Sequence, residues 1–207
     1  MTHSCEGAGC QVLLGDITIS RAGKTPSRGE PAYWGGPIPW VSAKDLKRHR
    51  LSGSLESITE QAINHGAPLA QPDDILILVR GMTLLKNVPI GLVETPMSFN
   101  QDVRCLRPGP NVSGEYLSYV LAMMRQRLLG LVTQAGNGTG RIESGQLAEL
   151  SLRLPPLGVQ QRIARVLRDC DVEISLLDQL SESYRAQKRA LMQRLLSGGA
   201  SELDPTA

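Results

Sequence analysis

Residues 157–197 read "LGVQQRIARVLRDCDVEISLLDQLSESYRAQKRALMQRLLS", and this stretch decides the architecture that the sequence predicts. It contains no proline and no glycine after Gly158. Apolar or aromatic side chains recur every seven residues, at Ile163, Cys170, Leu177, Tyr184 and Leu191. Others fill the steps of three and four residues between them, at Val166, Leu167, Ile174, Leu180 and Leu195. The pattern predicts one helix of about 37 residues, or about 55 Å at 1.5 Å per residue.

A helix of this length exceeds the diameter of a domain of this size, so its far half has no cover from its own chain. The heptad stripe therefore predicts a coiled-coil-type interface with a second helix. The predicted dimer interface comprises Ile163, Val166, Cys170, Ile174, Leu177, Tyr184 and Leu191. The alternative is a kinked helix that folds back on its own domain, although no residue inside the helix favours a break.

Upstream of the helix, patterns typical of strands and of helices alternate. The run "DDILILVRG" at 73–81 is apolar on both faces and predicts a buried strand. Residues 87–109 predict two strands joined by a turn near Pro96, and "LSLRLPPL" at 150–157 predicts a strand that ends at two prolines. "SITEQAINHG" at 57–66 predicts a short helix. Ser113 is placed to cap a longer helix, whose apolar face is Leu117, Val120, Leu121, Met124 and Leu128.

The predicted fold class is therefore α+β, with a mixed α/β domain followed by a long C-terminal helix of coiled-coil type. The predicted boundaries are an N-terminal extension at 1–11, the domain at 12–156, the helix at 157–197 and a disordered tail at 198–207.

Composition excludes several classes of protein. The 207 residues are 41% hydrophobic and 20% charged, which is ordinary for a folded soluble protein. No apolar run is long enough to cross a bilayer, and the N-terminus has no basic start, so we expect a cytoplasmic protein without a membrane partner. The four cysteines have irregular spacings that match no metal site. We expect reduced thiols, with Cys105 and Cys170 acting as small apolar side chains.

Charge is unevenly distributed along the chain. Residues 21–50 hold seven basic and two acidic side chains, a net charge of +5. Residues 51–79 hold four acidic side chains and no basic one, a net charge of −4. A local basic segment suits a polyanion, and a solvated loop explains it equally well.

Both tryptophans lie in this basic segment, in "YWGGPIPWVSAKDL" at 33–46. Two glycines and two prolines make the stretch neither a long helix nor a regular strand. We expect Trp34 and Trp40 to pack the loop onto the core rather than to stack on bases.

No catalytic set is evident in the sequence. "GNGTG" at 136–140 lacks the spacing of a phosphate-binding loop and predicts a structural turn. Asp73 has no downstream partner of the kind that a carboxylate–lysine nuclease requires. His3, His49 and His65 have no evident Ser or Cys partner. We therefore predict no catalytic residue, no metal site and no cofactor.

Recognition of a nucleic acid is the chemistry that remains. Lys and Arg neutralise phosphates, and Arg, Lys, Asn and Gln also read base edges. The chain carries such groups in its irregular segments. The candidate DNA-binding residues are Lys24, Arg28, Lys44, Lys47, Arg50, Arg80, Lys86, Arg104, Asn137 and Arg141. Asn100 and Gln101 are of the same chemical type, and they can equally well satisfy the backbone of a turn.

The order of motifs in the chain resembles that of a known family. The motifs are "LGDI", "GKTPSR", "YWGGPIPWVSAKDL", "SFNQDV", "LPPLGVQQRIARVL" and "KRALMQRLLSG". They resemble the DNA-specificity subunit of type I restriction–modification systems over nearly the whole chain after residue 11. The resemblance implies a non-catalytic subunit whose target recognition domain reads one half of a split DNA site. It also implies antiparallel pairing of the long helices, and three kinds of partner: double-stranded DNA, DNA adenine methyltransferase subunits and a motor nuclease.

The sequence departs from the family pattern in its length. Subunits of the family usually carry two recognition domains and two helices, and this chain carries one of each. It resembles a half-subunit that would form a homodimer and read a symmetric, interrupted site. A truncated product, or half of a split pair, fits equally well. The alternative function is a protein-interaction adaptor that uses the helix and binds no DNA of its own.

Charge on the predicted helix raises a further question. Arg162, Arg165 and Arg168 lie near its start, and residues 185–194 are basic again. A centred antiparallel pair brings these basic ends together. Either the arginines face away from the interface, or the pairing is offset.

Overall fold

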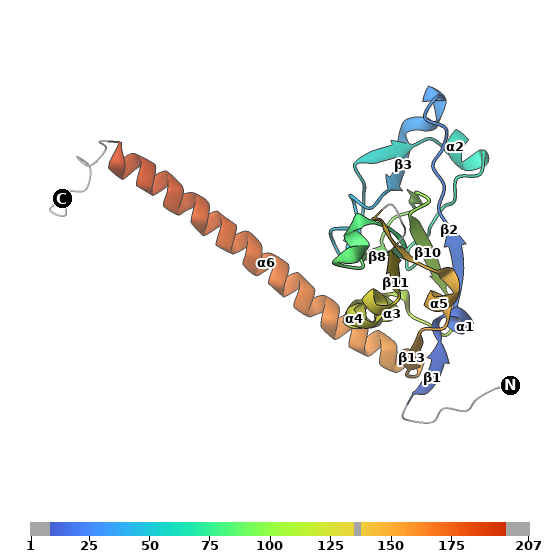
Figure 1. The fold of residues 1–207 in the computed structure, drawn as a ribbon. Helices are drawn as coiled ribbons and strands as arrows, with labels where there is room; N and C mark the ends of the chain where they lie inside the picture. The colour runs from blue at the N-terminus through green and yellow to red at the C-terminus, as the bar shows by residue number, and fades with distance from the viewer. Residues whose placement is uncertain (1–8, 135–137, 198–207) are drawn as a thin grey trace. The chain divides into compact units, whose positions relative to one another are not determined.

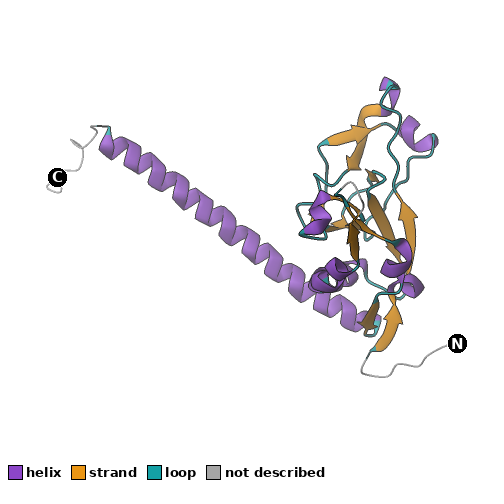
Figure 2. Ribbon diagram, viewed as in Figure 1, coloured by secondary structure: helices purple, strands orange, loops and turns teal. Residues whose placement is uncertain are grey.

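The computed structural model describes residues 9–134 and 138–197 of the 207-residue chain (Figure 1). Asn137, residues 1–8 of the predicted extension and the predicted tail at 198–207 lie outside the described residues. The chain forms two compact units, Met1–Ala164 and Arg165–Ala207. Figure 2 shows strands and short helices in the first unit and helix in the second, which confirms the predicted α+β class.

A five-stranded sheet forms the centre of the first unit. Its strand order is β2-β10-β6-β8-β4. The central strand β6, Ile75–Leu78, is buried along its whole length, as its apolar run predicts. It pairs antiparallel with β10, Val103–Pro108, and with β8, Ile90–Val93. The outer strands are β2, Thr18–Ala22, and the short β4, Arg50–Leu51. The sheet carries the main hydrophobic core, and this core holds the edge strand β4 in place.

Two smaller sheets extend the unit. Strand β1, Cys10–Leu13, pairs with β13, Ser151–Leu154, so the first strand begins inside the segment predicted as an extension. Strand β13 stops before the two prolines, as predicted. Strands β11, Val132–Gln134, and β12, Gly140–Ile142, are antiparallel neighbours, and β12 also pairs with β7, Arg80–Gly81.

The tryptophan-containing stretch is a bulged strand. Strand β3, Trp34–Val41, pairs with β5, Glu56–Ile58, and its register shifts between Trp34 and Ile38. Gly35, inside this shift, has φ +76°, a conformation that glycine adopts without strain. On its other side β3 pairs with β9, Ser98–Phe99. Residues 87–109 thus contain three strands, β8, β9 and β10, rather than the two predicted, because β9 follows the turn at Pro96 as a separate short strand.

The remaining elements of the first unit are short helices. The helix predicted after Ser113 is divided into α3, Gly114–Met123, and α4, Arg125–Gly130. The division falls at Met124, whose ψ of 13° departs from helical geometry. The predicted apolar face nevertheless packs into the core. The other helical segments are α1 Leu14–Ile17, η1 Pro31–Tyr33, α2 Glu60–Asn64, η2 Met82–Leu85 and α5 Ser144–Ala148.

The start of α3 has two caps. The Ser113 hydroxyl accepts a hydrogen bond from the backbone N–H of Tyr116 at 3.2 Å, as predicted. The Asp73 carboxylate accepts from the N–H groups of Gly114 at 2.9 Å and Glu115 at 3.0 Å. Burial raises the pKa of Asp73 despite these hydrogen bonds. Two side chains far apart in sequence therefore satisfy backbone donors that an isolated helix leaves unpaired.

The long helix α6, Leu157–Leu196, begins at the predicted residue and runs without interruption. Gln160 anchors its first turn within the first unit and is fully buried. The Gln160 Oε1 atom accepts from the Ser113 N–H at 2.9 Å. Its Nε2 atom donates to the carbonyls of Asn111 at 3.1 Å and Pro155 at 2.8 Å. Because every polar atom of this buried amide has a partner, the side chain holds the origin of α6 firmly in the first unit.

The predicted interface side chains of α6 are exposed in the single chain. Leu177 is 59% exposed, Ile174 56% and Leu191 57%, and Cys170 is exposed as well. Exposed apolar side chains spaced in heptads along an unbroken helix are typical of a helix that packs against another. Pairing with a second helix stays a prediction.

The cysteines differ in state. Cys105 is a buried thiol, as expected, and its burial, together with neighbouring Asp74, raises its pKa to about 12. Cys170 is a free thiol, as expected, and it is exposed in the single chain. Cys10 is in a disulfide, so the expectation of reduced thiols is wrong for this residue. Disulfide formation depends on how closely the folded chain brings two Cα atoms, which irregular sequence spacing does not reveal.

Candidate nucleic-acid interface

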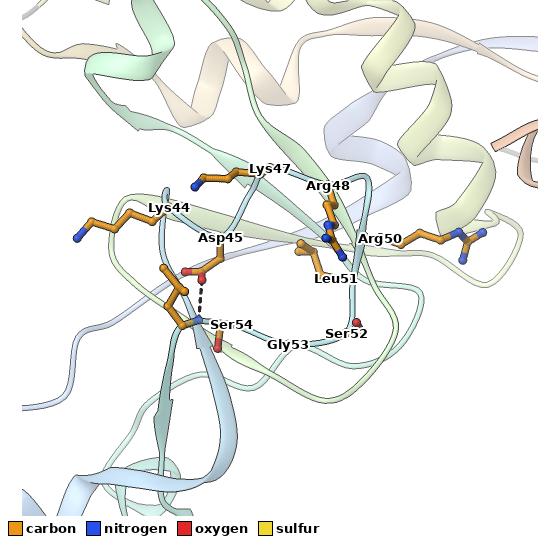
Figure 3. A pocket seen from close by; sticks show the side chains of 10 residues that line it. Lys44, Asp45, Lys47, Arg48, Arg50, Leu51, Ser52, Gly53 and Ser54 are labelled. Carbon is orange, nitrogen blue, oxygen red and sulfur yellow. Dashed lines mark hydrogen bonds between the residues drawn. The ribbon is translucent and has the colours of Figure 1, made fainter. Parts of the chain in front are cut away.

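Residues 42–55, here called the basic loop, connect β3 to β5 and enclose a shallow hollow of about 320 Å³ (Figure 3). Buried Leu46 and Leu51 anchor the loop in the core. Asp45 ties its two ends together, because Oδ2 accepts from the Ser42 N–H at 2.9 Å and Oδ1 accepts from the Leu55 N–H at 2.8 Å. The acidic side chain of the loop is thus engaged by the loop's own backbone, and Lys44, Lys47 and Arg48 are exposed.

Three of these cations are available to a ligand. Lys44, Lys47 and Arg48 are exposed, and their side chains make no hydrogen bond or ion pair with any described residue. Figure 3 shows Lys44 and Lys47 extending to the same side of the loop, whereas Arg50 extends the other way. Lys44 and Lys47 therefore present their charge on the same side of the basic loop.

A second hollow, of about 130 Å³, joins the basic loop to two other segments. Lys47 and Arg48 line it together with Asn87 and Arg125. Lys86 precedes Asn87, and both Lys86 and Arg125 are exposed and make no hydrogen bond or ion pair within the described part of the chain. We call Lys44, Lys47, Arg48, Lys86 and Arg125 the cation cluster. Arg48 and Arg125 are absent from the candidate DNA-binding residues predicted from the sequence. Arg48 lies in the basic segment at 21–50, whereas no sequence signal indicated Arg125.

Arg50 lies beside the cluster but is engaged within the protein. It forms ion pairs with Glu94, at 3.0 Å, and with Glu115. Burial lowers the pKa of Arg50, but hydrogen bonds and charges from the two glutamates outweigh it and raise the pKa overall. These contacts tie β4 to α3 and favour a structural role. Contact of Arg50 with DNA stays a prediction.

Arg28 belongs to an aromatic cluster. Its guanidinium carbon lies 3.8 Å from the centroid of Trp34 and 5.2 Å from that of Trp40. The two indole rings meet edge to face at 5.1 Å. Arg28 also pairs with Glu56, and this hydrogen bond raises the pKa of the arginine and lowers that of the glutamate. The guanidinium therefore covers the tryptophans, which favours a structural role for a residue predicted to bind DNA.

The indole nitrogens complete this cluster. Trp34 Nε1 donates to the carbonyl of Ser27 at 3.0 Å, and Trp40 Nε1 donates to that of Lys24 at 3.2 Å. Trp40 is buried in a small core with Ile58. The expectation that the tryptophans pack the loop is confirmed.

We expect Arg28→Gln to loosen the aromatic cluster and to lower the free energy of unfolding by about 1 kcal/mol, because a cation–π contact at an exposed site contributes roughly that much. Both tryptophans of the chain are in the cluster, so their fluorescence should shift to longer wavelength. Urea denaturation followed by tryptophan emission measures both effects. Arg21→Gln, at another exposed arginine, is the matched control, and equal behaviour of the two variants would contradict the structural role.

Two other predicted residues donate to protein groups. Lys24 Nζ donates to the carbonyl of His65 at 3.1 Å, and Arg104 Nη1 donates to the Ser20 hydroxyl at 3.1 Å. These bonds hold neighbouring segments together, so either residue would have to exchange a protein contact for one with DNA.

Arg80 and Arg141 lie opposite each other on β7 and β12. Arg141 pairs with Glu143 at 2.9 Å. Arg80 is exposed, and its side chain makes no hydrogen bond or ion pair within the described ranges. Asn137, predicted to act with Arg141, lies outside the described residues.

Asn100 and Gln101 support a turn. The Asn100 Oδ1 atom accepts from the N–H of Asp102 at 3.1 Å, and the Gln101 side chain accepts from the Thr25 hydroxyl. Asn100 is also largely buried. The interpretation as a local turn contact is confirmed for Asn100, whereas the Gln101 side chain joins the turn to Thr25, 76 residues away in sequence.

The structure brings one histidine to a serine that the sequence did not indicate. His49 Nε2 lies 3.0 Å from the Ser118 hydroxyl, which is 69 residues away in sequence. Ser118 is fully buried, and its hydroxyl donates to the carbonyl of Glu115 at 2.7 Å. A hydroxyl that is buried and already engaged cannot reach a substrate, so the pair is structural.

No group of three or more His, Cys, Asp or Glu side chains among the described residues is arranged to hold a metal ion. None of the described helices combines the length and apolar character needed to cross a bilayer.

Comparison with known proteins identifies the family. Residues 11–183 match the family model of the type I restriction modification DNA specificity domain. The chain belongs to this family. Two specificity subunits of the family are each 30% identical to it: that of the type I restriction enzyme EcoR124I/EcoR124II from Escherichia coli and that of MjaIX from Methanocaldococcus jannaschii. The matches cover 83% and 85% of this chain but only 46% and 39% of those relatives. The chain therefore spans less than half the length of the specificity subunits that it matches.

Solved structures in the type I restriction–modification systems share the fold. The HsdS subunit from Thermoanaerobacter tengcongensis aligns with a TM-score of 0.63 at 19% identity, covering 94% of this chain and 45% of that subunit. The S subunit from M. genitalium aligns with a TM-score of 0.60 at 15% identity, covering 97% and 49%. The family's fold is thus present here, and again over about half of each longer chain.

Proposed function

We propose that this protein is a non-catalytic DNA sequence-recognition subunit that reads one half of a bipartite DNA site. The observation that carries the proposal is the cation cluster. Lys47 and Arg48 of the basic loop and Arg125 at the start of α4 line one hollow, with Lys86 next in sequence to its lining residue Asn87, on a domain of the DNA specificity family.

The cluster suits the phosphate backbone. Each phosphate that a lysine or arginine neutralises releases condensed counterions, so affinity falls as salt rises. The five cations of the cluster are exposed and form no hydrogen bond or ion pair within the described residues, which leaves them accessible for such contacts. Base readout then falls to groups that face the groove, because phosphate contacts position a protein but carry no sequence information.

The presence of one recognition domain followed by one long helix supports recognition of a half-site. One recognition domain and one helix correspond to about half of a specificity subunit. Two copies joined through the exposed stripe of α6 would present two domains related by a two-fold axis. Such a dimer reads a symmetric, interrupted site, because two-fold symmetry in the protein implies the same symmetry in the DNA.

The remaining partners follow from the family. In this proposal the paired helices also dock DNA adenine methyltransferase subunits, and a motor nuclease joins the complex. The long helix suits this role, because its charged faces outside the stripe remain exposed when two copies pair.

The test begins by mapping modified adenines in the host genome, which defines the target. The protein, with its methyltransferase subunits, is then titrated by gel shift against three duplexes: the intact target, one with a single half-site scrambled, and one with both scrambled. We expect the intact target to bind at least about 1,000-fold more tightly than the fully scrambled duplex, with affinity falling steeply with salt. Equal affinity for all three duplexes would overturn the proposal.

A further inference from the structure

The continuous helix α6 allows each residue to be assigned a place relative to the proposed seam between two copies. With Cys170 and Leu177 at heptad position d, position a holds Leu167, Ile174, Ser181, Lys188 and Leu195. Arg162, Arg165 and Arg168 then fall at positions c, f and b, which point away from the seam. The basic start of the helix therefore does not oppose a centred pairing.

In an antiparallel pair, position a of one helix faces position d of the other, so the permitted registers differ by steps of one heptad. They are distinguished by the residue that faces Cys170. That residue is the partner's Ser181, the partner's Lys188 or the partner's Leu195. Which register is adopted determines how far apart the two recognition domains are held.

The register that sets Cys170 against the partner's Ser181 is disfavoured. It sets Leu191 against the partner's Gln160, which is fully buried in the first unit. It also places Asp171 near the partner's Asp178 along the edge of the seam, twice by symmetry. Like charges at these flanking positions oppose pairing.

The register that sets Cys170 against the partner's Leu195 has the better charge pattern but a poorer seam. It pairs Asp178 with the partner's Arg185 along the edge. However, it leaves Leu167 without a facing residue on the partner helix, and it sets Lys188 against the partner's Leu177. The two-fold symmetry repeats both defects in the second copy. Burying a leucine stabilises more than an exposed ion pair does, so this register loses more in the seam than it gains at the edge.

We propose that two copies of α6 pair in the third register, with Cys170 facing the partner's Lys188; this inference rests on the proposed pairing of two copies. Leu167 then faces the partner's Leu191, and Ile174 faces the partner's Tyr184. The two remaining layers set Ile163 against the partner's Leu195 and Leu177 against the partner's Ser181.

The charges along the edges of the seam, and the layer of Cys170 and the partner's Lys188, are compatible with pairing in this register. Asp171 lies near the partner's Arg185 on both sides of the two-fold axis. One contact between like charges remains along the edge, that of Asp178 with the partner's Asp178, and it occurs once because it lies on the two-fold axis. The long aliphatic stem of Lys188 packs over the thiol while its ammonium group extends to solvent.

The native thiol makes the register testable in the full chain. We expect Lys188→Cys to form an intermolecular disulfide with Cys170 of the partner subunit on mild oxidation, giving a covalent dimer on a non-reducing gel. The wild type should give no covalent dimer through Cys170, because the thiol does not face its own symmetry mate. Ser181→Cys and Leu195→Cys are the matched controls, since each would cross-link in a competing register. Cross-linking of either control in preference to Lys188→Cys would overturn the assignment.

A charge swap provides a second readout that needs no disulfide. Asp171→Arg should weaken dimerisation several-fold, and adding Arg185→Asp on the same chain should restore it. A dimer that the second change does not rescue excludes the register. A wild-type protein that is monomeric by light scattering would instead refute the pairing itself, so the two failures are distinguishable.

Discussion

Leu177→Asp is expected to make the protein monomeric. Leu177 is 59% exposed in the single chain and lies at the middle of the heptad stripe, where pairing would remove it from water. A carboxylate at that place would lose its hydration without gaining a cationic partner, in both copies at once. We expect a loss of about 4 kcal/mol in dimerisation free energy, or roughly a thousandfold in the dissociation constant.

Light scattering and sedimentation at several concentrations measure the change. The adjacent Leu176 provides a matched control, because it is 60% exposed but lies at position c, away from the seam. Leu176→Asp should leave the dimer intact. A Leu177→Asp protein that remains dimeric would refute the assignment of the stripe, whereas monomers from both variants would point to a wider interface.

Reversing the charge of Lys44, Lys47 and Arg48 to glutamate is expected to abolish tight DNA binding. Removing three phosphate contacts should reduce the slope of log affinity against log salt by about 3. The new carboxylates also repel the backbone, so we expect affinity to fall by a factor of about 100 to 1,000 at physiological salt. Anisotropy titrations at several salt concentrations measure both quantities.

A control with the same change in net charge separates a local contact from long-range attraction. The control variant reverses three arginines of α6 to glutamate: Arg162, Arg165 and Arg168. It should weaken DNA binding far less, and the slope of log affinity against log salt should not change. The loop variant should still bind the methyltransferase subunits. Unaltered DNA affinity in the loop variant would remove the cation cluster from the interface. A wild type that binds the methyltransferase subunits but no DNA would support the adaptor alternative.

The features of the fold that could be predicted depend on local patterns. The start of α6 at Leu157, the buried strand β6 and the cap at Ser113 all follow from the periodicity or chemistry of adjacent residues. The division of one predicted helix at Met124 and the separate strand β9 did not follow, because propensity does not determine where packing interrupts an element.

The candidate site was predictable as a region but not residue by residue. A count of charges identified the basic segment that contains Lys44, Lys47 and Arg48. It could not reveal that Arg50 is paired with Glu115, 65 residues away. Nor could it place Arg125 beside the basic loop, because that proximity depends on how α4 packs against the sheet.

The sequence by itself therefore determined the long amphipathic helix and its heptad stripe, because helical geometry sets which side chains share a face whatever surrounds them. It also determined the family, through motifs spread along the chain. Only the tertiary structure decided which cations remain available to DNA, because an arginine loses that availability by meeting a carboxylate or an aromatic ring from a distant segment. Arg28 on Trp34, and Arg50 between two glutamates, were engaged in this way, whereas Lys47 was left in solvent.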